Sequence, residues 1–359
     1  MAVSLIDELS RMVDLPDGLA ILVSNEVHAN LQSINSDFSR FSSYEVFNTY
    51  GPSALWSDLS KKVSGFDVVF TVFGPLYLWP SRTVSIVGFA QPWIIYPNNE
   101  IYRSLPFFQK LKTRLKLFTQ SLFFRLPDRL VVELEHVKKE LVARRFLDAH
   151  RIDVVHNCLG SVYLRPEQWR PLLNRVIKKN FSIGVVGRDY PHKNTSILPE
   201  IKKVLNDVHG LKVDFYVTLN PVEWVAKSDL FHASVNNVGA LDVAQCPSFY
   251  HQMDAIIFPS FLECFSATPL EAMAMGKPLF ASDRGFVRDV CGDFAWYFDP
   301  EDPVGAADLI ANYINNQAAG DGAQLIAARE HVINFSNSRQ RAADYLRIIQ
   351  ATAMGRALH

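Results

Sequence analysis

The feature that most constrains the fold is a regular alternation between short apolar runs and polar stretches of helical length. Parallel strands that are buried on both faces form continuous apolar runs, and each crossover between them requires a segment long enough for a helix. The chain is therefore predicted to be α/β, with doubly wound parallel sheets. The ten runs predicted to be strands are residues 19–24, 66–73, 84–90, 128–134, 153–157, 181–187, 213–219, 254–260, 277–282 and 295–299.

These runs form two series, separated by a segment at about residues 160–180 that has no strand pattern. A chain of 359 residues suits two domains of ordinary size. We therefore predict an amino-terminal domain over residues 1–165 and a carboxy-terminal domain over residues 166–335. Residues 336–359 are predicted to form a final helix that can pack back on the first domain.

Composition excludes several classes of protein. The formal net charge of −1 gives no overall electrostatic basis for binding nucleic acid. The four cysteines form no C-x-x-C pair, so neither a structural zinc site nor a disulfide framework is expected, and a reducing compartment fits. No apolar run is long enough for a membrane span, and the acidic first residues do not fit a signal peptide. We expect a cytoplasmic protein, soluble or peripheral on a membrane.

The first group of candidate site residues follows the run at 181–187. Ligands bind beyond the carboxyl ends of strands in a doubly wound sheet. Gly187 allows close backbone approach, and Arg188 and Lys193, five residues apart, could clamp a diphosphate. A solvated loop with a helix N-cap at Asn194 explains this segment about equally well.

The second group follows the run at 254–260. Backbone N–H groups of residues 265–270 would point out of a helix amino terminus, which is a ready site for phosphate. The sequence Thr268-Pro269-Leu270-Glu271 predicts an N-cap, a proline at the first helical position and a capping-box glutamate, so Glu271 has a structural explanation. Glu263 has none, and its simplest interpretation is a solvated surface carboxylate.

Taken in order, these motifs resemble those of the family 4 retaining glycosyltransferases of the GT-B fold (glycosyl transferases group 1). The E-x7-E signature of that family resembles FPSFLECFSATPLEAMAMGKPLFASDRG at 258–285, and the flanking segments GVVGR…HKN, NNVGALDVAQCPSFYHQMDAIIFPS and YFDPEDPVGAADLI also match its pattern. The resemblance covers about residues 181–315 and is weak before them. It implies two Rossmann-like domains facing a central cleft.

The resemblance also implies roles for individual residues. Arg188 and Lys193 would neutralise the donor diphosphate, and Glu263 would contact the hydroxyls of the transferred sugar; these three are the expected catalytic residues. Fixed cations and helix-end dipoles would stabilise the departing nucleoside diphosphate, with no metal and no cofactor. The expected donor-binding residues also include Gly187 at the diphosphate, Asn237, Val238 and Gly239 beside the base, and Glu271 at the ribose. The N–H groups of Phe265 and Ser266 would meet sugar and phosphate oxygens, and Ala267 completes the donor-binding set.

The amino-terminal half departs from the family pattern in two places. Members usually begin with a strand and a glycine-rich loop, whereas this chain begins within a predicted helix, so the first strand is expected to be missing and activity is in question. Where the family often has a histidine near the reacting sugar, this chain has Gln91, which could contact acceptor or sugar or could simply be a turn residue before Pro92.

A basic and aromatic stretch occupies residues 101–127. It contains six Lys or Arg, no acidic residue and five phenylalanines. As a helix it places Leu111, Leu115, Phe118 and Leu122 on one side, which could lie on an anionic membrane surface near a lipid-linked acceptor. Equally well, the phenylalanines could pack on the first domain while the lysines are solvated.

The expected function is sugar transfer, with retention, from a UDP- or GDP-linked donor to a saccharide or lipid-linked acceptor in surface polysaccharide, lipopolysaccharide or O-antigen biosynthesis (EC 2.4). A first alternative is a GT-B nucleotide-sugar epimerase, which would release sugar or form an epimer without acceptor. A second is a non-catalytic nucleotide-sugar-binding subunit, which would bind donor tightly without turnover. The sequence identifies neither the sugar nor the base.

Overall fold

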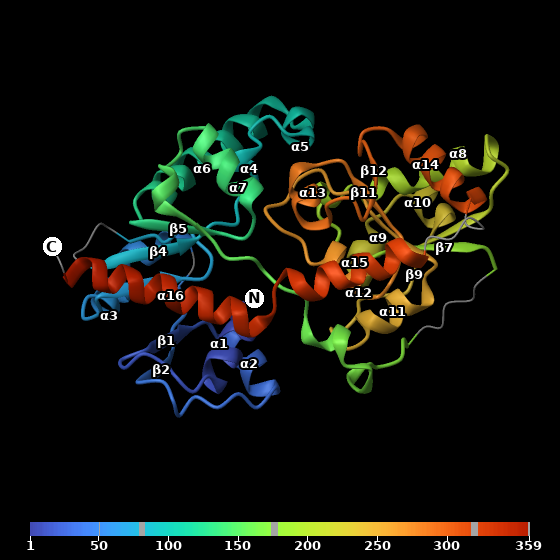
Figure 1. The fold of residues 1–359 in the computed structure, drawn as a ribbon. Coiled ribbons are helices and arrows are strands. Elements are labelled where there is room, and N and C mark those ends of the chain that lie inside the picture. The colour runs from blue at the N-terminus through green and yellow to red at the C-terminus, as the bar shows by residue number, and fades with distance from the viewer. Residues whose placement is uncertain (50, 79–82, 174–178, 317–321, 358–359) are drawn as a thin grey trace. The chain divides into compact units, whose positions relative to one another are not determined.

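The computed structural model describes residues 1–49, 51–78, 83–173, 179–316 and 322–357. It divides into two units, which are described separately (Figure 1). Unit 1 comprises Met1–Ile95, Pro106–Asn157 and Ser336–His359, and unit 2 comprises Tyr96–Leu105 and Cys158–Phe335. Part of the segment predicted to join the domains, residues 174–178, lies outside the described residues.

Unit 1 contains two parallel sheets. In the larger one the strand order is β3-β4-β5-β6, and in the smaller one β1 pairs with β2. Strand β2 was missed from the sequence because its residues alternate between exposed and partly buried positions and form no apolar run. The bounds are β1 Ala20–Val23, β2 Ser43–Val46, β3 Val68–Thr71, β4 Val84–Gly88, β5 Arg129–Val132 and β6 Ile152–Val154.

The core of unit 1 joins the two ends of the chain. Helix α16 (Ser338–Ala357) packs along α1 (Ala2–Arg11), as Figure 1 shows in red and blue. Leu5 and Tyr345 are buried in one cluster with Ile86 of the sheet. The helix predicted at the start of the chain is confirmed as α1; its Leu5 and Leu9 are buried, whereas Val13 lies beyond its end and is 80% exposed. The other helices are α2 Asn25–Ser33, α3 Leu59–Val63, α4 Pro92–Ile95, α6 Phe107–Arg125 and α7 Glu135–Ala143.

Unit 2 contains one six-stranded parallel sheet with the order β12-β11-β10-β7-β8-β9. Five of these strands were predicted, and β9 was missed because it has three residues, two of them asparagine. The bounds are β7 Phe181–Val185, β8 Val213–Val217, β9 Val235–Asn237, β10 Ala255–Phe258, β11 Leu279–Ser282 and β12 Trp296–Phe298.

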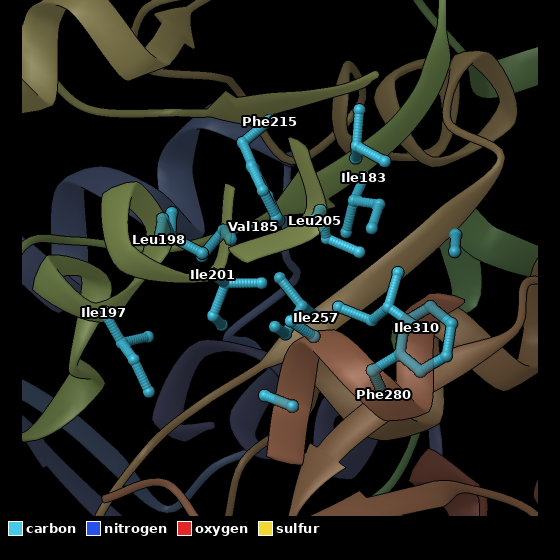
Figure 2. Close-up of a cluster of buried hydrophobic side chains, with 14 of the residues drawn as sticks. Ile183, Val185, Ile197, Leu198, Ile201, Leu205, Phe215, Ile257, Phe280 and Ile310 are labelled. Carbon is cyan, nitrogen blue, oxygen red and sulfur yellow. The ribbon is translucent and has the colours of Figure 1, made fainter. Parts of the chain in front are cut away.

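Helices α8 (Leu198–Asp207) and α14 (Pro303–Asn316) pack against each other beside this sheet, and the buried side chains between them and the strands are drawn in Figure 2. Asp302 caps the start of α14, since its Oδ1 accepts hydrogen bonds from the backbone N–H groups of Val304 and Gly305. The remaining helices are α5 Glu100–Ser104, α9 Pro221–Val225, α10 Asp229–Ser234, α11 Cys246–Gln252, α12 Thr268–Ala274, α13 Gly285–Cys291 and α15 Gly322–Phe335. Over the described ranges, no helix combines the length and apolarity that crossing a bilayer requires.

Candidate donor-binding site

The carboxyl ends of all six strands of unit 2 lie at one edge of the sheet, because the strands are parallel. From β7 the chain adds β8 and then β9 on one side, and β10, β11 and β12 on the other. The order therefore reverses between β7 and β10. In open α/β sheets a ligand crevice forms at this switch point.

The two loops at the switch point are joined by an ion pair. Nζ of Lys193, after β7, lies 2.7 Å from Oε1 of Glu263, after β10, and the two side chains are only 18% and 11% exposed. The ammonium also lies 5.4 Å from the centre of the Phe258 ring. The backbone N–H of Phe261 donates to the carbonyl of His192, which connects the same loops. The interpretation of Glu263 as a solvated surface carboxylate is therefore wrong, since its charge is largely enclosed and paired.

Arg188 points to a different carboxylate. Its Nε lies 2.5 Å from Oε1 of Glu223, and its side chain is 59% exposed. Glu223 is fixed by a capping box with Asn220, in which each side chain accepts from the backbone N–H of the other. Glu223 was missed as a partner, although the sequence Asn-Pro-Val-Glu at 220–223 carries the capping-box pattern.

Gly187 is required by its backbone conformation. Its φ of +138° is unfavourable for residues with a side chain, whereas an added Cβ would meet no atom within 4 Å. Its N–H donates to Oγ1 of Thr218 at 3.1 Å. The following Asp189 accepts from Thr195 and Lys227 at 2.7 and 2.6 Å, so the loop is anchored on both sides of Arg188.

The two neighbours of Lys193 have structural roles. Burial lowers the pKa of His192, so its ring is largely neutral at pH 7, and the ring stacks on Tyr190 with centroids 5.5 Å apart. Asn194 adopts a left-handed conformation and donates from Nδ2 to the carbonyl of Pro300. Asn194 occupies the N-cap position of a short 3-10 helix, Thr195–Ile197, but its side chain makes no capping bond, so the alternative interpretation as a helix N-cap is correct for its position only.

The predicted capping box at Glu271 is also wrong. Helix α12 begins at Thr268 with Ala267 as its N-cap and no side-chain capping bond. Oε2 of Glu271 instead accepts from the hydroxyl of Tyr250 at 2.7 Å, because a buried phenol hydroxyl needs an acceptor. Although the residue is partly exposed, its carboxylate is enclosed, and burial raises its pKa. Tyr250, Tyr163 and Lys193 oppose this rise by favouring the charged form. Lys193 therefore favours the charged form of Glu271 and forms an ion pair with Glu263, so it interacts with both glutamates of the E-x7-E segment.

The segment before α12 lies next to Glu263. Ser266 is buried, whereas Phe265 and Ala267 are partly exposed. These three residues follow β10, so they lie at the same sheet edge as the ion pair.

The predicted base-binding residues lie at the carboxyl end of β9, an edge strand of the sheet; Asn237 is its last residue, and Val238 and Gly239 follow it. Oδ1 of Asn237 accepts from the N–H groups of Leu219 and Gly239, and its Nδ2 donates to the carbonyl of Leu219. Val238 is buried, and Gly239 has a φ of +89°. The polar atoms of Asn237 thus shape the loop, and its neighbours offer mainly backbone to a ligand.

Gln91 belongs to unit 1, just after β4. Its Nε2 donates to Oε1 of Gln120 on α6 at 3.0 Å. The interpretation as a turn residue is compatible with its place directly before α4, but the side chain has a specific partner on another helix.

Comparisons with known proteins agree with this geometry. Residues 174–332 match the model of the family described as Glycosyl transferases group 1. The O-antigen chain mannosyltransferase RfbU of Salmonella typhimurium is 24% identical over 242 residues, which are 64% of each chain. A lipopolysaccharide 1,2-N-acetylglucosaminetransferase of the same organism is 26% identical over 163 residues, 45% of this chain and 37% of that one. Both matches thus span less than two thirds of these curated relatives.

The likeness in fold extends over almost the whole chain. The crystal structure of Anabaena HepE in complex with UDP and glucose superposes with a TM-score of 0.65 and 15% identity, covering 96% of this chain and 95% of that one. The expected GT-B class of fold, with its parallel sheets and covering helices, is thereby confirmed. The chain has the GT-B fold, and its residues 174–332 resemble the glycosyl transferases group 1.

Proposed function

We propose that this protein is a glycosyltransferase that moves a sugar, with retention of configuration, from a nucleoside-diphosphate donor to a saccharide or lipid-linked acceptor in the assembly of a surface polysaccharide. The Lys193–Glu263 ion pair at the switch point of the unit 2 sheet carries this proposal. A hydrolase of glycosides needs two carboxylates but no cation to receive a diphosphate. Here Glu263, which follows β10 at the switch point, is paired with such a cation, Lys193.

In the proposed donor complex, Lys193 and Arg188 meet the diphosphate. An ammonium has three N–H donors, so Lys193 can hold Glu263 and phosphate oxygens together. Arg188 is largely exposed and bound to Glu223, so a phosphate can share its guanidinium without displacing a buried contact. As the bond between the anomeric carbon and the diphosphate breaks, these fixed cations stabilise the departing charge, and no metal is required for this role.

The two glutamates have separate parts in the proposal. Glu263 is held in place by Lys193 and accepts from sugar hydroxyls. Glu271 is held by Tyr250 and accepts from the ribose. Since a carboxylate with few water contacts accepts hydrogen bonds strongly, both serve to orient the donor before transfer.

The comparisons support the class of reaction. RfbU is described as a mannosyltransferase of O-antigen chains, and HepE was crystallised with UDP and glucose. We extend to this chain the use of a UDP- or GDP-linked sugar and the role in surface polysaccharide assembly.

A thermal-shift screen against UDP, GDP, ADP and their common sugar conjugates tests donor binding. A ligand at 100 times its dissociation constant stabilises by about 2.7 kcal/mol, which for a unit of this size raises Tm by about 5–10 °C. We expect one base to give this shift, and we expect the combined substitutions Arg188→Met and Lys193→Met to remove it. Lys202→Met is the matched control, since Lys202 is partly buried and contacts the carbonyl of Ser234 at the opposite edge of the sheet.

No shift with any nucleotide would contradict the donor site, and a shift that survives the double substitution would contradict its location. Retention is tested separately by NMR of the anomeric proton of the product. Unchanged transfer in EDTA supports the role of fixed cations, whereas complete loss that Mg²⁺ restores contradicts it.

A further inference from the structure

Helix α6 of unit 1, labelled in Figure 1, carries a row of exposed apolar side chains. At 3.6 residues per turn, six of its large apolar side chains fall within an arc of about 100°. We call these residues the α6 stripe. They are Phe107, Phe108, Leu111, Leu115, Phe118 and Leu122, which are 75%, 82%, 60%, 66%, 61% and 48% exposed.

The opposite side of the same helix holds it to unit 1. Phe124 is fully buried against Phe89, and Phe123 packs on the ring of Tyr77 with centroids 4.7 Å apart. The prediction that the phenylalanines of this stretch pack on the first domain is therefore correct for these two and wrong for the three in the α6 stripe. A helix that is already anchored by one apolar face needs no second one for folding.

Basic residues border the α6 stripe on both sides. Lys112 and Lys116 follow one edge of the arc, and Lys110 and Arg114 follow the other. Lys112, Arg114 and Lys116 are exposed, and no acidic residue occurs between positions 101 and 127. This is the arrangement of an interfacial helix, in which apolar side chains enter the acyl region and cations meet anionic headgroups.

We propose that the α6 stripe docks on the surface of an anionic lipid bilayer. The 19-residue helix is about 28 Å long and can lie flat with its apolar side in the headgroup boundary. A second copy of the chain is a poorer occupant, because a symmetric pairing of stripes brings identical rows of cations together. An anionic membrane matches both the apolar and the basic part of the surface.

Docking of the α6 stripe on a bilayer has a consequence for the approach of the acceptor, and this consequence rests on the proposed function. The inner side of α6 carries Gln120, which accepts from Gln91 at the carboxyl end of β4. The helix that touches lipid thus also fixes the loop that was predicted to contact the acceptor. A lipid-linked acceptor would reach unit 1 from the surface on which α6 lies.

Vesicle co-sedimentation of the full chain tests the proposal. We use vesicles of phosphatidylcholine alone and of phosphatidylcholine mixed with phosphatidylglycerol, and expect binding to the mixed vesicles only. Leu115→Gln with Phe118→Gln should weaken binding at least about ten-fold, since both side chains insert into the boundary. Lys112→Gln with Lys116→Gln should weaken it by roughly five-fold per cation and reduce its salt dependence.

Two exposed residues of unit 1 provide matched controls. Val13→Gln changes an apolar side chain that is 80% exposed, and Lys61→Gln changes an exposed cation, both outside α6, so neither should alter vesicle binding. All variants should keep the nucleotide thermal shift, which separates failure of docking from failure of the donor site. The proposal is overturned if the chain stays in the supernatant with both vesicles, or if sedimentation velocity shows self-association that the stripe variant abolishes.

Discussion

The Lys193–Glu263 pair allows a quantitative test by a double-mutant cycle. The perturbations are Lys193→Met, Glu263→Gln and the two together. Lys193→Met leaves the largely buried charge of Glu263 without its partner at 2.7 Å, and Glu263→Gln leaves the largely buried charge of Lys193 facing a neutral amide. Breaking such a pair costs about 3 kcal/mol, whereas removing both members costs much less, because no charge is left unpaired.

The side chains retain 18% and 11% exposure, so solvent screens part of this interaction and the coupling energy should be about 2 kcal/mol. For a unit of this size, each single substitution then lowers Tm by about 6–10 °C. Urea denaturation followed by tryptophan fluorescence measures the free energies of unfolding. Hydrogen exchange at the amides of β7 and β10 assigns the transition to unit 2.

The exposed pair of Lys61 with Asp58, whose side chains are 85% and 68% exposed, is the control and should show no measurable coupling. If the Lys193 and Glu263 substitutions were simply additive, the pair would not hold the two loops together, and the physical basis of the proposed site would fail.

Three further predictions concern single residues. Burial raises the pKa of Glu133 to about 7, so the folded state favours its protonated form and stability should fall by about 3 kcal/mol as the pH rises from 4.5 to 7; Glu133→Gln should flatten this part of the profile measured by urea titration. A Cβ at Gly88 would lie 1.8 Å from the carbonyl oxygen of Val72, so Gly88→Ala should force β3 and β4 apart and cost about 3 kcal/mol, with loss of exchange protection in both strands. Tyr250→Phe removes a donor to the Glu271 carboxylate and should raise its pKa further, so that nucleotide affinity, measured by calorimetry, falls more at pH 5.5 than at pH 8.

Strands that are buried on both faces were predictable, because burial on both faces requires apolar residues at successive positions. Each of the ten predicted runs overlaps a strand of the structure. The two missed strands, Ser43–Val46 and Val235–Asn237, owe their conformation to a neighbouring strand and not to their own apolarity. Their sequences therefore gave no comparable signal.

In the candidate site, the order of the strands brings together Lys193 and Glu263, which are 70 residues apart in the sequence. Lys193 and Glu263 follow two different predicted strands, and they meet because parallel strands end at one edge of the sheet. The role of Glu271 in capping was wrong because a local pattern cannot show a competing tertiary partner, here Tyr250. The attachment of Arg188 to Glu223 depended in the same way on a contact between distant segments.

Unit 1 draws its core from both ends of the polypeptide, and this affects the order of folding during synthesis. Every strand of unit 2 leaves the ribosome before α16 exists, whereas Leu5 of α1 must wait for Tyr345 and Leu346 to complete its surroundings. Unit 2 can thus become protease-resistant while the chain is still incomplete. The first residues to be made are among the last to be protected.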